Sequence, residues 1–447
     1  MKEQFENILK IPELRKKITF TLFILILVRL GTHIPLPGIN TTALKAAMEN
    51  MSNTLFGLYD LFAGGAFSRA TLFALGIMPY ISSSIIIQLL GSVIPYLQKL
   101  QKEGESGKKK ITQITRYVTV GIALLQSFGI AQFLMGPQMV AQVGNRSVPV
   151  VPNQGLGFLL LTMLTLTSGT VLLMWLGERI SERGIGNGIS LIIMVGILAR
   201  FPSVVMKEVR MVSQGLRGIF TEVFLLGIMV AIIGFVVYIT QGKRKIPVQY
   251  AKRVKGRKVY GGQSTHIPLK VNTAGVLPII FAQAIMFIPN TISTFFQGSE
   301  FIQSITSVFN MQHPVYWIVK GILIIFFTYF YTAIAFNPVE VADNMKKSGG
   351  FIPGVRPGKK TSEFIDNILT KVTLPGSIFL AFVAIFPYIM MKTMGIEYST
   401  ASFFGGTSVL IIVGVGLDTL QQIESHLQMR HYDGFMKGQS KKMKGRR

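Results

Sequence analysis

The sequence predicts an all-α polytopic membrane protein with ten transmembrane helices in two inverted five-helix halves. Three observations lead to this fold class. The composition is 49% hydrophobic and only 15% charged, whereas about a quarter of a soluble globular chain is charged. Apolar segments of membrane-spanning length recur along the whole chain. The 45 lysines and arginines, against 20 acids, gather between these segments, so the excess positive charge lies outside the bilayer.

The predicted spans follow from the need for about 20 mostly apolar residues per crossing. Nine are clear: Ile18–Leu36, Leu72–Leu97, Tyr117–Met135, Leu156–Leu176, Val223–Ile239, Val271–Ile292, Val315–Phe336, Leu374–Met391 and Phe403–Leu420. The fifth in chain order is weak, because its apolar part, Ile189–Ala199, is too short alone and needs residues as far as Val205 to cross. No small-residue cleavage site follows the first span, so we expect that span to be retained.

Basic residues set the expected orientation. With ten spans, one set of loops holds most of the lysines and arginines: Met1–Lys17, Lys99–Arg116, Arg179–Arg183, Lys243–Lys270, Lys346–Lys371 and Arg430–Arg447. The positive-inside rule then places these loops and both termini in the cytoplasm. Without the weak fifth span the basic tail would lie outside, against the same rule, so we keep that span.

Ten spans divide at the basic stretch Met206–Arg217 into two sets of five. Because five is odd, the second set starts from the opposite face, so a repeat would have inverted topology. We therefore expect an N-terminal half at residues 1–206 and a C-terminal half at 207–447, the latter with basic cytoplasmic loops at 241–270 and 337–371. The two halves share no convincing residue-level identity, so the repeat rests on topology alone.

Catalytic and metal-binding patterns are missing from the sequence. There is no cysteine, and the five histidines lie in loops or near span ends without a metal-ligand spacing. The stretch Gly354–Thr361, GVRPGKKT, departs from a phosphate loop, because only three residues separate its first glycine from the Gly-Lys pair and a second lysine follows. We therefore expect no cofactor, no metal and no enzymatic activity.

Ionisable side chains within the spans are few. Arg29, Lys320 and Lys392 fall toward outer ends and Asp418 near an inner end. Such groups usually mark proton relays or substrate sites, and each can equally snorkel to the interface. Their scarcity argues against the alternative function, an inverted-repeat secondary transporter, because a transporter needs a binding or coupling cluster near the midplane. A membrane-embedded enzyme is also disfavoured, because the predicted spans contain no nucleophile, metal site or acid pair that it would need.

Two early segments have unusual character. Residues Asp60–Ala70, DLFAGGAFSRA, are too polar and too short to span, yet too apolar for a solvated loop. We expect this segment to tuck into a vestibule, with a surface loop as the other interpretation. The second span joins Gly76 and Pro79 to the serine run Ser82–Ser84, which is typical of a bent helix with a hydroxyl-bearing face.

The stretch Lys243–Lys258 carries eight basic residues and no acid. Alternation around Val248, Tyr250 and Val254 predicts a hairpin that projects from the membrane. So dense a basic loop attracts nucleic acid, anionic lipid or an acidic protein. Orientation and lipid anchoring alone are the other interpretation.

Several long strings resemble the bacterial SecY family. They run in order from near one end of the chain to the other: PLPGI (35–39), FALGIMPYIS (73–82), KEGESGKKKI (102–111), MWLGERISERGIGNGIS (174–190), YAKRVKGRKVYGGQSTHIPLKVNTAGVLPIIFA (250–282), FNPVEVADNMKKSGGFIPGVRPG (336–358) and FGGTSVLIIVG (404–414). Because several exceed ten residues, the resemblance is highly specific.

The resemblance implies a protein-conducting channel without catalytic chemistry. Such a channel exports unfolded polypeptides across the bacterial plasma membrane and inserts membrane proteins laterally, through a central pore between halves that close like a clamshell. The implied partners are the subunits SecE and SecG, the ATPase SecA, the ribosome with its rRNA, unfolded preproteins, anionic lipid, and other insertion or export factors.

The resemblance also implies a plug and a pore ring. The plug would be Asp60, Leu61, Phe62, Ala63, Gly64, Gly65, Ala66, Phe67, Ser68, Arg69 and Ala70. We expect it to be mobile and loosely packed, because it has two adjacent glycines and few large apolar residues. The pore ring would be Ile77, Ile81, Ile189, Ile193, Ile280 and Ile411. The first two pairs have i,i+4 spacing, which puts each pair on one helix face.

The remaining implied sites are a lateral gate and a docking surface. The gate lies between helices two and three of one half and seven and eight of the other, and we place Ser82, Gln88 and Asn272 at its seam. The motor and the ribosome would bind at Arg257, Lys258 and Arg356, with Arg356 pointing outward. One departure is Val339, where the family often has a basic residue.

Overall fold

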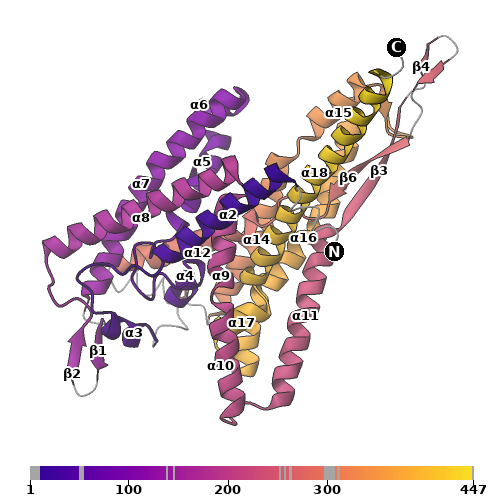
Figure 1. The fold of residues 1–447 in the computed structure, drawn as a ribbon. Coiled ribbons are helices and arrows are strands. Elements are labelled where there is room, and N and C mark those ends of the chain that lie inside the picture. The colour runs from indigo at the N-terminus through magenta and orange to yellow at the C-terminus, as the bar shows by residue number, and fades with distance from the viewer. Residues whose placement is uncertain are drawn as a thin grey trace.

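The computed structural model describes residues 11–49, 55–136, 139–143, 146–250, 253–255, 258–260, 264–295, 308–309 and 313–444. The fold is helical (Figure 1). Its helices are α2 (Pro12–Gly31), α3 (Thr41–Glu49), α4 (Leu55–Phe62), α5 (Met78–Val93), α6 (Pro95–Lys102), α7 (Glu105–Met135), α8 (Leu156–Arg183), α9 (Gly188–Leu198), α10 (Phe201–Ser213), α11 (Ile219–Gln241), α12 (Leu277–Phe295), α14 (Pro314–Ala335), α15 (Pro338–Lys347), α16 (Lys359–Met394), α17 (Tyr398–Phe404) and α18 (Thr407–Lys444). Its strands are β1 (Val140–Val143), β2 (Arg146–Pro149), β3 (Lys243–Tyr250), β4 (Arg253–Lys255), β5 (Lys258–Tyr260), β6 (Ser264–Lys270) and β7 (Gly350–Phe351).

Every predicted span overlaps a helix. In the described ranges, seven helical stretches are long and apolar enough to cross a membrane, and the bent pair of α5 and α6 adds an eighth. The weak fifth span is among the seven, because α9 and α10 together run from Gly188 to Ser213. Helix α2 and the shorter apolar helix α12 lie at the first and seventh predicted spans.

The second span is shorter than the sequence predicted. We expected Leu72–Leu97, whereas residues 72–77 form turns and α5 covers only Met78 to Val93. Pro79 stands in its first turn, where the missing N–H costs nothing. At the other end Pro95 holds the preceding residue in extended backbone. Helix α6 therefore leaves α5 at 98°.

A glycine-rich turn joins α8 to α9 and sets the position of α9. The backbone N–H of Gly188 donates to Ser181 Oγ at 2.9 Å, and Asn187 Oδ1 accepts from Ser190 N at 3.2 Å as the cap of α9. A Cβ at Gly188 would collide with the carbonyl oxygen of Gly177 in α8. Only glycine therefore permits this close approach of the two helices.

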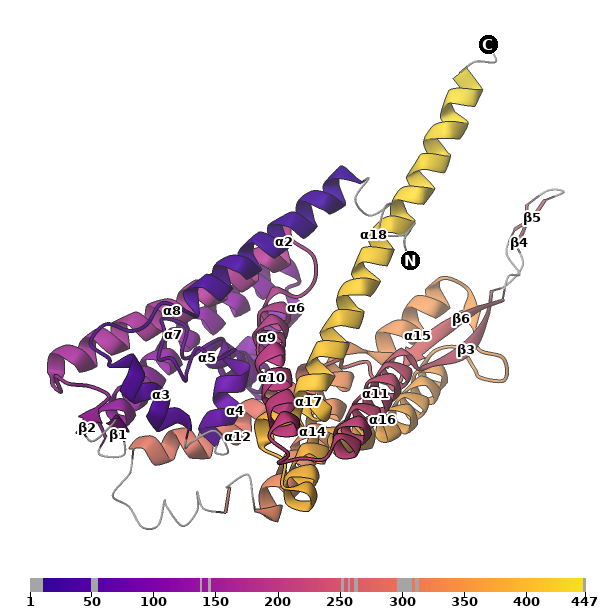
Figure 2. The ribbon, with the colours of Figure 1, turned by 60° about the horizontal axis from the view of Figure 1, so that its bottom comes forward.

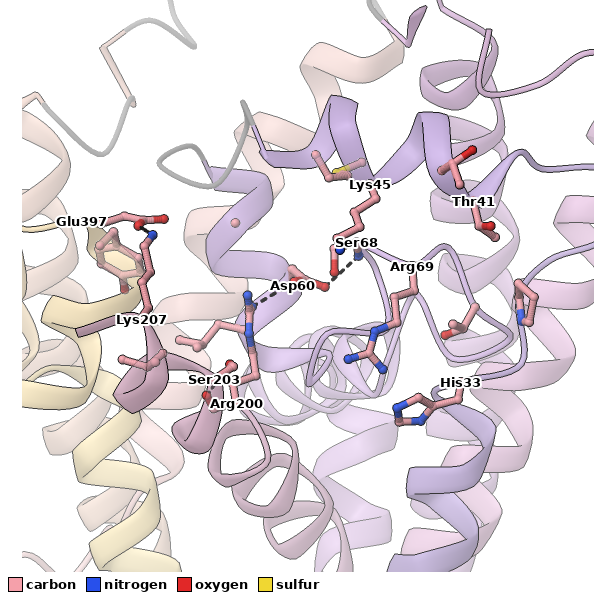
Figure 3. A pocket seen from close by; sticks show the side chains of 18 residues that line it. His33, Thr41, Lys45, Asp60, Ser68, Arg69, Arg200, Ser203, Lys207 and Glu397 are labelled. Atoms are coloured by element: carbon pink, nitrogen blue, oxygen red, sulfur yellow. Dashed lines mark hydrogen bonds and ion pairs between the residues drawn. The ribbon is translucent and has the colours of Figure 1, made fainter. Parts of the chain in front are cut away.

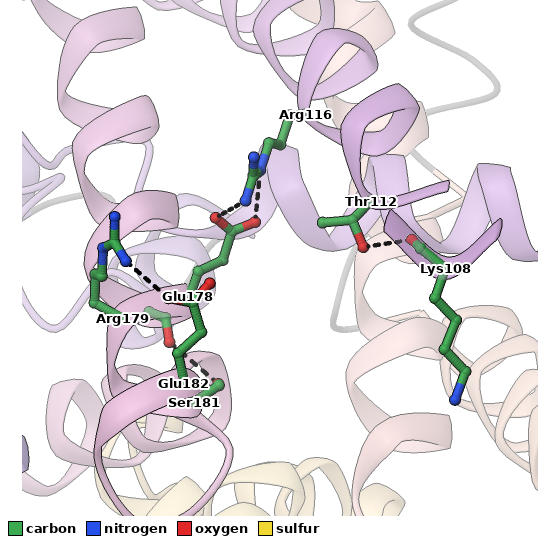
Figure 4. Close-up of polar contacts among 8 residues, drawn as sticks. Lys108, Thr112, Arg116, Glu178, Arg179, Ser181 and Glu182 are labelled. Carbon is green, nitrogen blue, oxygen red and sulfur yellow. Dashed lines mark hydrogen bonds and ion pairs between the residues drawn. The ribbon is translucent and has the colours of Figure 1, made fainter. Parts of the chain in front are cut away.

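Ion pairs fix the end of α8 that leads into this turn (Figure 4). Arg116 of α7 makes two hydrogen bonds to the carboxylate of Glu178, at 3.0 and 2.7 Å. Arg179 pairs with Glu182 within α8 at 2.8 Å. The bidentate pair is the more directional of the two, so it ties α8 to α7 where the chain turns toward α9.

The predicted basic hairpin is confirmed. Strands β3 and β6 are antiparallel, and β4 pairs with β5 nearer the tip. Figures 1 and 2 show these strands extending beyond the ends of the neighbouring helices. Strand β7, from the loop between α15 and α16, pairs with β3. The base of the hairpin also shares an apolar cluster with α15 and α16, made of Ile246, Val248, Leu269, Met345, Ile352 and Ile365.

One large apolar cluster connects the early and late parts of the chain. It includes residues of α2, α5, α9, α12, α14, α16 and α18, together with the turns of residues 63–77. Helix α12 contacts α5 and α7 as well as α14, and α9 contacts α18. Figure 2 shows α9 beside α18 near the middle of the molecule.

Candidate functional site

A cavity of about 600 Å³ lies where the α8–α9 turn, the segment before α12 and the helix α18 meet. We call it the inner cavity. Lys270 and Asp418 are charged groups in its wall, and Lys270 Nζ donates to Gln421 at 2.9 Å. Most of the other lining groups are polar and uncharged, among them Asn187, Ser190, Asn272, Thr273, Thr419, Gln422 and Ser425. The wall offers hydrogen bonds from many directions.

The six predicted ring isoleucines belong to the large apolar cluster or pack against it, and none of them lines the inner cavity. Five are almost fully buried, namely Ile77, Ile81, Ile193, Ile280 and Ile411, and Ile189 packs against the same cluster. Ile189 directly precedes Ser190 of the cavity wall, and Ile411 lies one helical turn before Val415, which also lines the cavity. All six isoleucines thus belong to, or pack against, one large apolar cluster. Their action as a ring remains a prediction.

The predicted plug segment docks closely on α9. A Cβ at Gly64 would stand 2.8 Å from the Cα of Gly196 and 2.7 Å from Arg29 Nη1. Gly64 also has φ of +66°, so glycine is required there twice over. Arg29 of α2 donates to the Gly64 carbonyl at 3.2 Å. The segment thus touches two helices through its backbone.

The expectation of a loosely packed plug is wrong for the state that the structure describes. Leu61, Phe62 and Phe67 are each no more than 5% exposed. The ring of Tyr59, just before the segment, makes edge contacts with Phe67 and with Phe287 of α12, both at 5.3 Å. Burial raises the pKa of Tyr59 far above its usual range, so its hydroxyl stays neutral. That hydroxyl donates to the carbonyl of residue 75 at 2.8 Å.

Asp60 provides an ion pair between this segment and the end of α9. One carboxylate oxygen accepts from Ser68 N at 2.8 Å, and the other lies 2.9 Å from Arg200 Nη1. The Asp60 side chain is 5% exposed and that of Arg200 is 29% exposed. The sequence analysis did not predict this role of Arg200. The available signal was an acid in the plug segment, Asp60, and a lone arginine at the end of the fifth apolar stretch, Arg200.

A second cavity, of about 760 Å³, opens beside this ion pair (Figure 3). We call it the outer cavity. Its charged lining groups are Lys45, Asp60, Arg69, Arg200, Lys207 and Glu397. Lys207 of α10 pairs with Glu397, next to α17. Among the described residues, Lys45 and Arg69 have no carboxylate partner, so the wall is basic. Figure 3 shows both side chains beside the Asp60 contact.

Helix α9 and the two residues that follow it contribute to these features in chain order. Ser190 lines the inner cavity, Ile193 joins the apolar cluster, Gly196 receives the plug segment, and Arg200 faces the outer cavity. Ten residues at 1.5 Å each span about 15 Å. Two polar cavities are thus separated by an apolar layer and a docked segment.

The predicted gate residues make local hydrogen bonds. Gln88 Nε2 donates to Ser84 Oγ at 3.0 Å within α5, and Asn272 Nδ2 donates to the Gly275 carbonyl at 3.1 Å. Ser82 is half-buried. No hydrogen bond joins Gln88 to Asn272 in the part of the chain that the structure describes, although α5 and α12 are in contact. The seam therefore remains a prediction.

The predicted docking residues lie at the other end of the molecule from the outer cavity. Arg356 is exposed and forms no ion pair with any described residue, as expected. Gly354 and Gly358 flank it with φ of +81° and +99°. Arg257 lies outside the described residues, and Lys258 begins β5 but its side chain is not described.

Comparisons with known proteins agree with this geometry. The SecY family model matches residues 71–420. The chain is 46% identical over 441 residues to the protein translocase subunit SecY of Streptomyces galbus, covering 97% of this chain and 99% of that protein. A solved structure described as "The structure of a protein conducting channel" is similar with a TM-score of 0.64 at 17% identity, covering 92% of each chain. Sec61 in the canine ribosome–channel complex from the endoplasmic reticulum is similar with a TM-score of 0.60 at 16% identity, also over 92% of each chain. The chain belongs to the SecY family.

Proposed function

We propose that this chain is the channel through which unfolded polypeptides cross a bacterial plasma membrane and apolar segments enter it sideways. The observation that carries the proposal is the order along α9 of polar cavity, apolar layer, docked segment and second polar cavity. A secondary transporter would need a substrate-binding or ion-coupling cluster of polar residues near the bilayer midplane, where we place the isoleucine ring of this chain.

The isoleucines supply the seal. A narrow apolar constriction loses its water and offers no ligand to ions, yet it makes no demand on the sequence of a passing chain. Isoleucine suits the task because it is bulky, stiff at χ1 and without a polar group. Ile77, in the turn before α5, and Ile81 of α5 would face Ile193 of α9, Ile280 of α12 and Ile411 of α18, with Ile189 at the inner rim.

The plug segment supplies a second barrier and a switch. Displacing residues 60–70 breaks the Asp60–Arg200 ion pair and exposes Leu61, Phe62 and Phe67. Losing these contacts costs free energy. The arriving chain or a partner must supply that free energy by binding the displaced state more tightly than the docked state, since a ligand shifts an equilibrium only by its differential affinity for the two states. The tight docking therefore favours a closed resting channel.

The lateral gate would open between α5 and α12, which are in contact in the closed state. Ser82, Gln88 and Asn272 are half-buried or buried beside apolar neighbours. Polar groups at such a seam weaken helix–helix packing and can exchange partners with water or a signal helix. Partition of the segment into lipid then follows its transfer free energy.

The basic hairpin and the Arg356 turn would receive the driving partners. They share one base through β3, β7 and the apolar cluster with α15 and α16, so both can contact one partner. Exposed Arg356 and the tip around Arg257 and Lys258 suit the phosphates of rRNA or acidic groups of a motor ATPase such as SecA.

The remaining assignments concern topology and companions. The basic loops put both termini in the cytoplasm. Helix α11 exposes large apolar residues along its length, among them Phe220, Val223, Phe224 and Val230. Lipid or small subunits of the SecE and SecG kind would cover such helices, and anionic lipid would meet the basic loops.

Reconstitution tests the proposal directly. Vesicles containing the purified chain with its co-purifying subunits should import a preprotein when a partner ATPase and ATP are added. Arg356→Glu should abolish this import without lowering the unfolding temperature, because Arg356 is exposed and forms no ion pair with a described residue. Lys359→Glu, an equal charge change three residues away at an exposed site, serves as the matched control and should retain most of the activity. Normal import by the Arg356→Glu variant would contradict the docking assignment.

A further inference from the structure

Lys320 of α14 is fully buried, and the snorkelling considered from the sequence is wrong for it. Its ammonium nitrogen donates to the hydroxyl of Tyr388 in α16 at 2.9 Å and lies 5.0 Å from the centre of that ring. No carboxylate lies within ion-pair distance of it among the residues described. A buried ammonium has three donors, and a single neutral hydroxyl meets only one of them.

The polar groups around Lys320 are also unsatisfied. Tyr316 lies one helical turn before Lys320 on α14, and its ring contacts that of Tyr388 at 5.5 Å. Among the described residues, no hydrogen bond of good geometry reaches the Tyr316 hydroxyl or either polar atom of Gln283 on α12. Gln283 and Tyr388 are the polar neighbours of that hydroxyl, and Gln283 is completely buried. Three helices therefore turn donor groups toward one place.

An unpaired positive charge and orphaned donors are costly in an apolar interior. Native proteins usually satisfy such groups with an ordered water or an ion. Here the ammonium, the phenol hydroxyl and the amide N–H₂ of Gln283 can all donate, whereas the amide oxygen of Gln283, which is also unmet, can only accept. A small anion would accept from the three donors and neutralise the charge, which water would not do.

We propose that Lys320, Tyr316 and Gln283 form a buried binding site for a small monovalent anion of halide size. The anion would lie among α12, α14 and α16, and Tyr388 would hold the lysine in place. Because Gln283 belongs to α12, occupancy would link α12 to the α14–α16 pair. The site is separate from both cavities, since none of these residues lines either of them.

Anion titration of the purified full-length chain tests the site. The unfolding temperature is measured in sodium gluconate, chloride and bromide at equal ionic strength. Wild type should gain about 2 °C or more, saturably, in chloride or bromide, because a ligand that binds only the folded state stabilises it. Lys320→Met should lose this dependence. Lys392→Met is the matched control, since Lys392 is exposed and lies 5.9 Å from the Trp317 ring beside the cluster, and it should keep the full dependence.

A subtler variant guards against simple misfolding. Tyr316→Phe removes one orphaned hydroxyl and no charge, and it should shift the chloride midpoint upward by about tenfold, the usual effect of one hydrogen bond to a charged group. Bromide should also give an anomalous scattering peak beside Lys320 Nζ in crystals. Equal unfolding temperatures in gluconate and chloride, an unchanged dependence in Lys320→Met, or water alone at that position would each overturn the proposal.

Discussion

The inner and outer cavities differ in how they use polarity. The inner cavity is lined mostly by neutral hydrogen-bonding groups such as Ser190 and Thr419, with few charges. The outer cavity is lined by charges, and two of its basic groups are already paired, Arg200 with Asp60 and Lys207 with Glu397. The difference teaches that the outer wall is committed to specific internal contacts, whereas the inner wall is not; under the proposed function, the inner wall would suit a passing polar backbone and the outer contacts would hold the channel closed.

Removing the barrier between the cavities should have the largest effect. Replacing Ile77, Ile81 and Ile280 together by serine should raise the resting ion conductance of reconstituted vesicles by about a hundredfold, at roughly 1 kcal/mol of apolar barrier per side chain. Ile86→Ser with Ile288→Ser is the control, because these isoleucines lie on α5 and α12, as Ile81 and Ile280 do, but are exposed. A triple variant as tight as wild type, with the plug segment also deleted, would move the seal elsewhere.

Breaking the outer ion pair should have an intermediate effect. Asp60→Asn or Arg200→Gln should increase the population of channels with a displaced plug about fivefold to thirtyfold, since about 1–2 kcal/mol is lost when one partner of a partly buried pair is removed. Single-channel opening frequency measures this population.

Two further variants decide whether the ion pair itself is responsible. The swap of Asp60→Arg with Arg200→Asp should restore part of the closed population. Lys207→Met breaks the other ion pair of the same cavity without touching the plug segment, so its opening frequency should match wild type. An equal rise in Lys207→Met would show that general charge, and not the plug contact, controls closure.

Changing the inner wall should have the smallest effect. Ser190→Ala removes one of many neutral groups, so import rates should change by less than about fivefold, since a single hydrogen bond contributes about 1 kcal/mol. Ser190→Asp places a charge there and should slow acidic substrate segments more than basic ones. Uniform slowing of both substrate types would mean that the inner wall recognises its substrate through specific contacts.

The helical spans and the hairpin could be predicted from the sequence, because apolar length and strand alternation are local signals. The weak fifth span was predicted only because the distribution of basic loops required it. The structure shows why its apolar stretch is short: α9 ends at Leu198, and α10 continues the crossing. The early part of the second span was predicted wrongly. Its apolar residues 72–77 form turns next to the plug segment, and hydropathy does not distinguish a buried turn from a helix.

Contacts between distant residues were beyond the sequence. The Asp60–Arg200 pair and the approach of Gly64 to Gly196 join segments more than a hundred residues apart, and nothing local in either segment selects the other. The tight packing of the plug segment was missed for the same reason, since its partners on α2, α9 and α12 cannot be read from its own composition.

The hairpin has a mechanical consequence. Strand β3 of eight residues is a stiff arm about 26 Å long, and its partner β6 leads through residues 271–276 directly into α12. The base of the arm is clamped to α15 and α16 by β7 and the apolar cluster. A force applied near the tip of the hairpin therefore turns the hairpin about its base at α16. Because β6 continues into α12, this rotation acts on the first turn of α12. Under the proposed function, work done by a partner on the hairpin would reach the contact between α5 and α12 as a torque, without the partner entering the membrane.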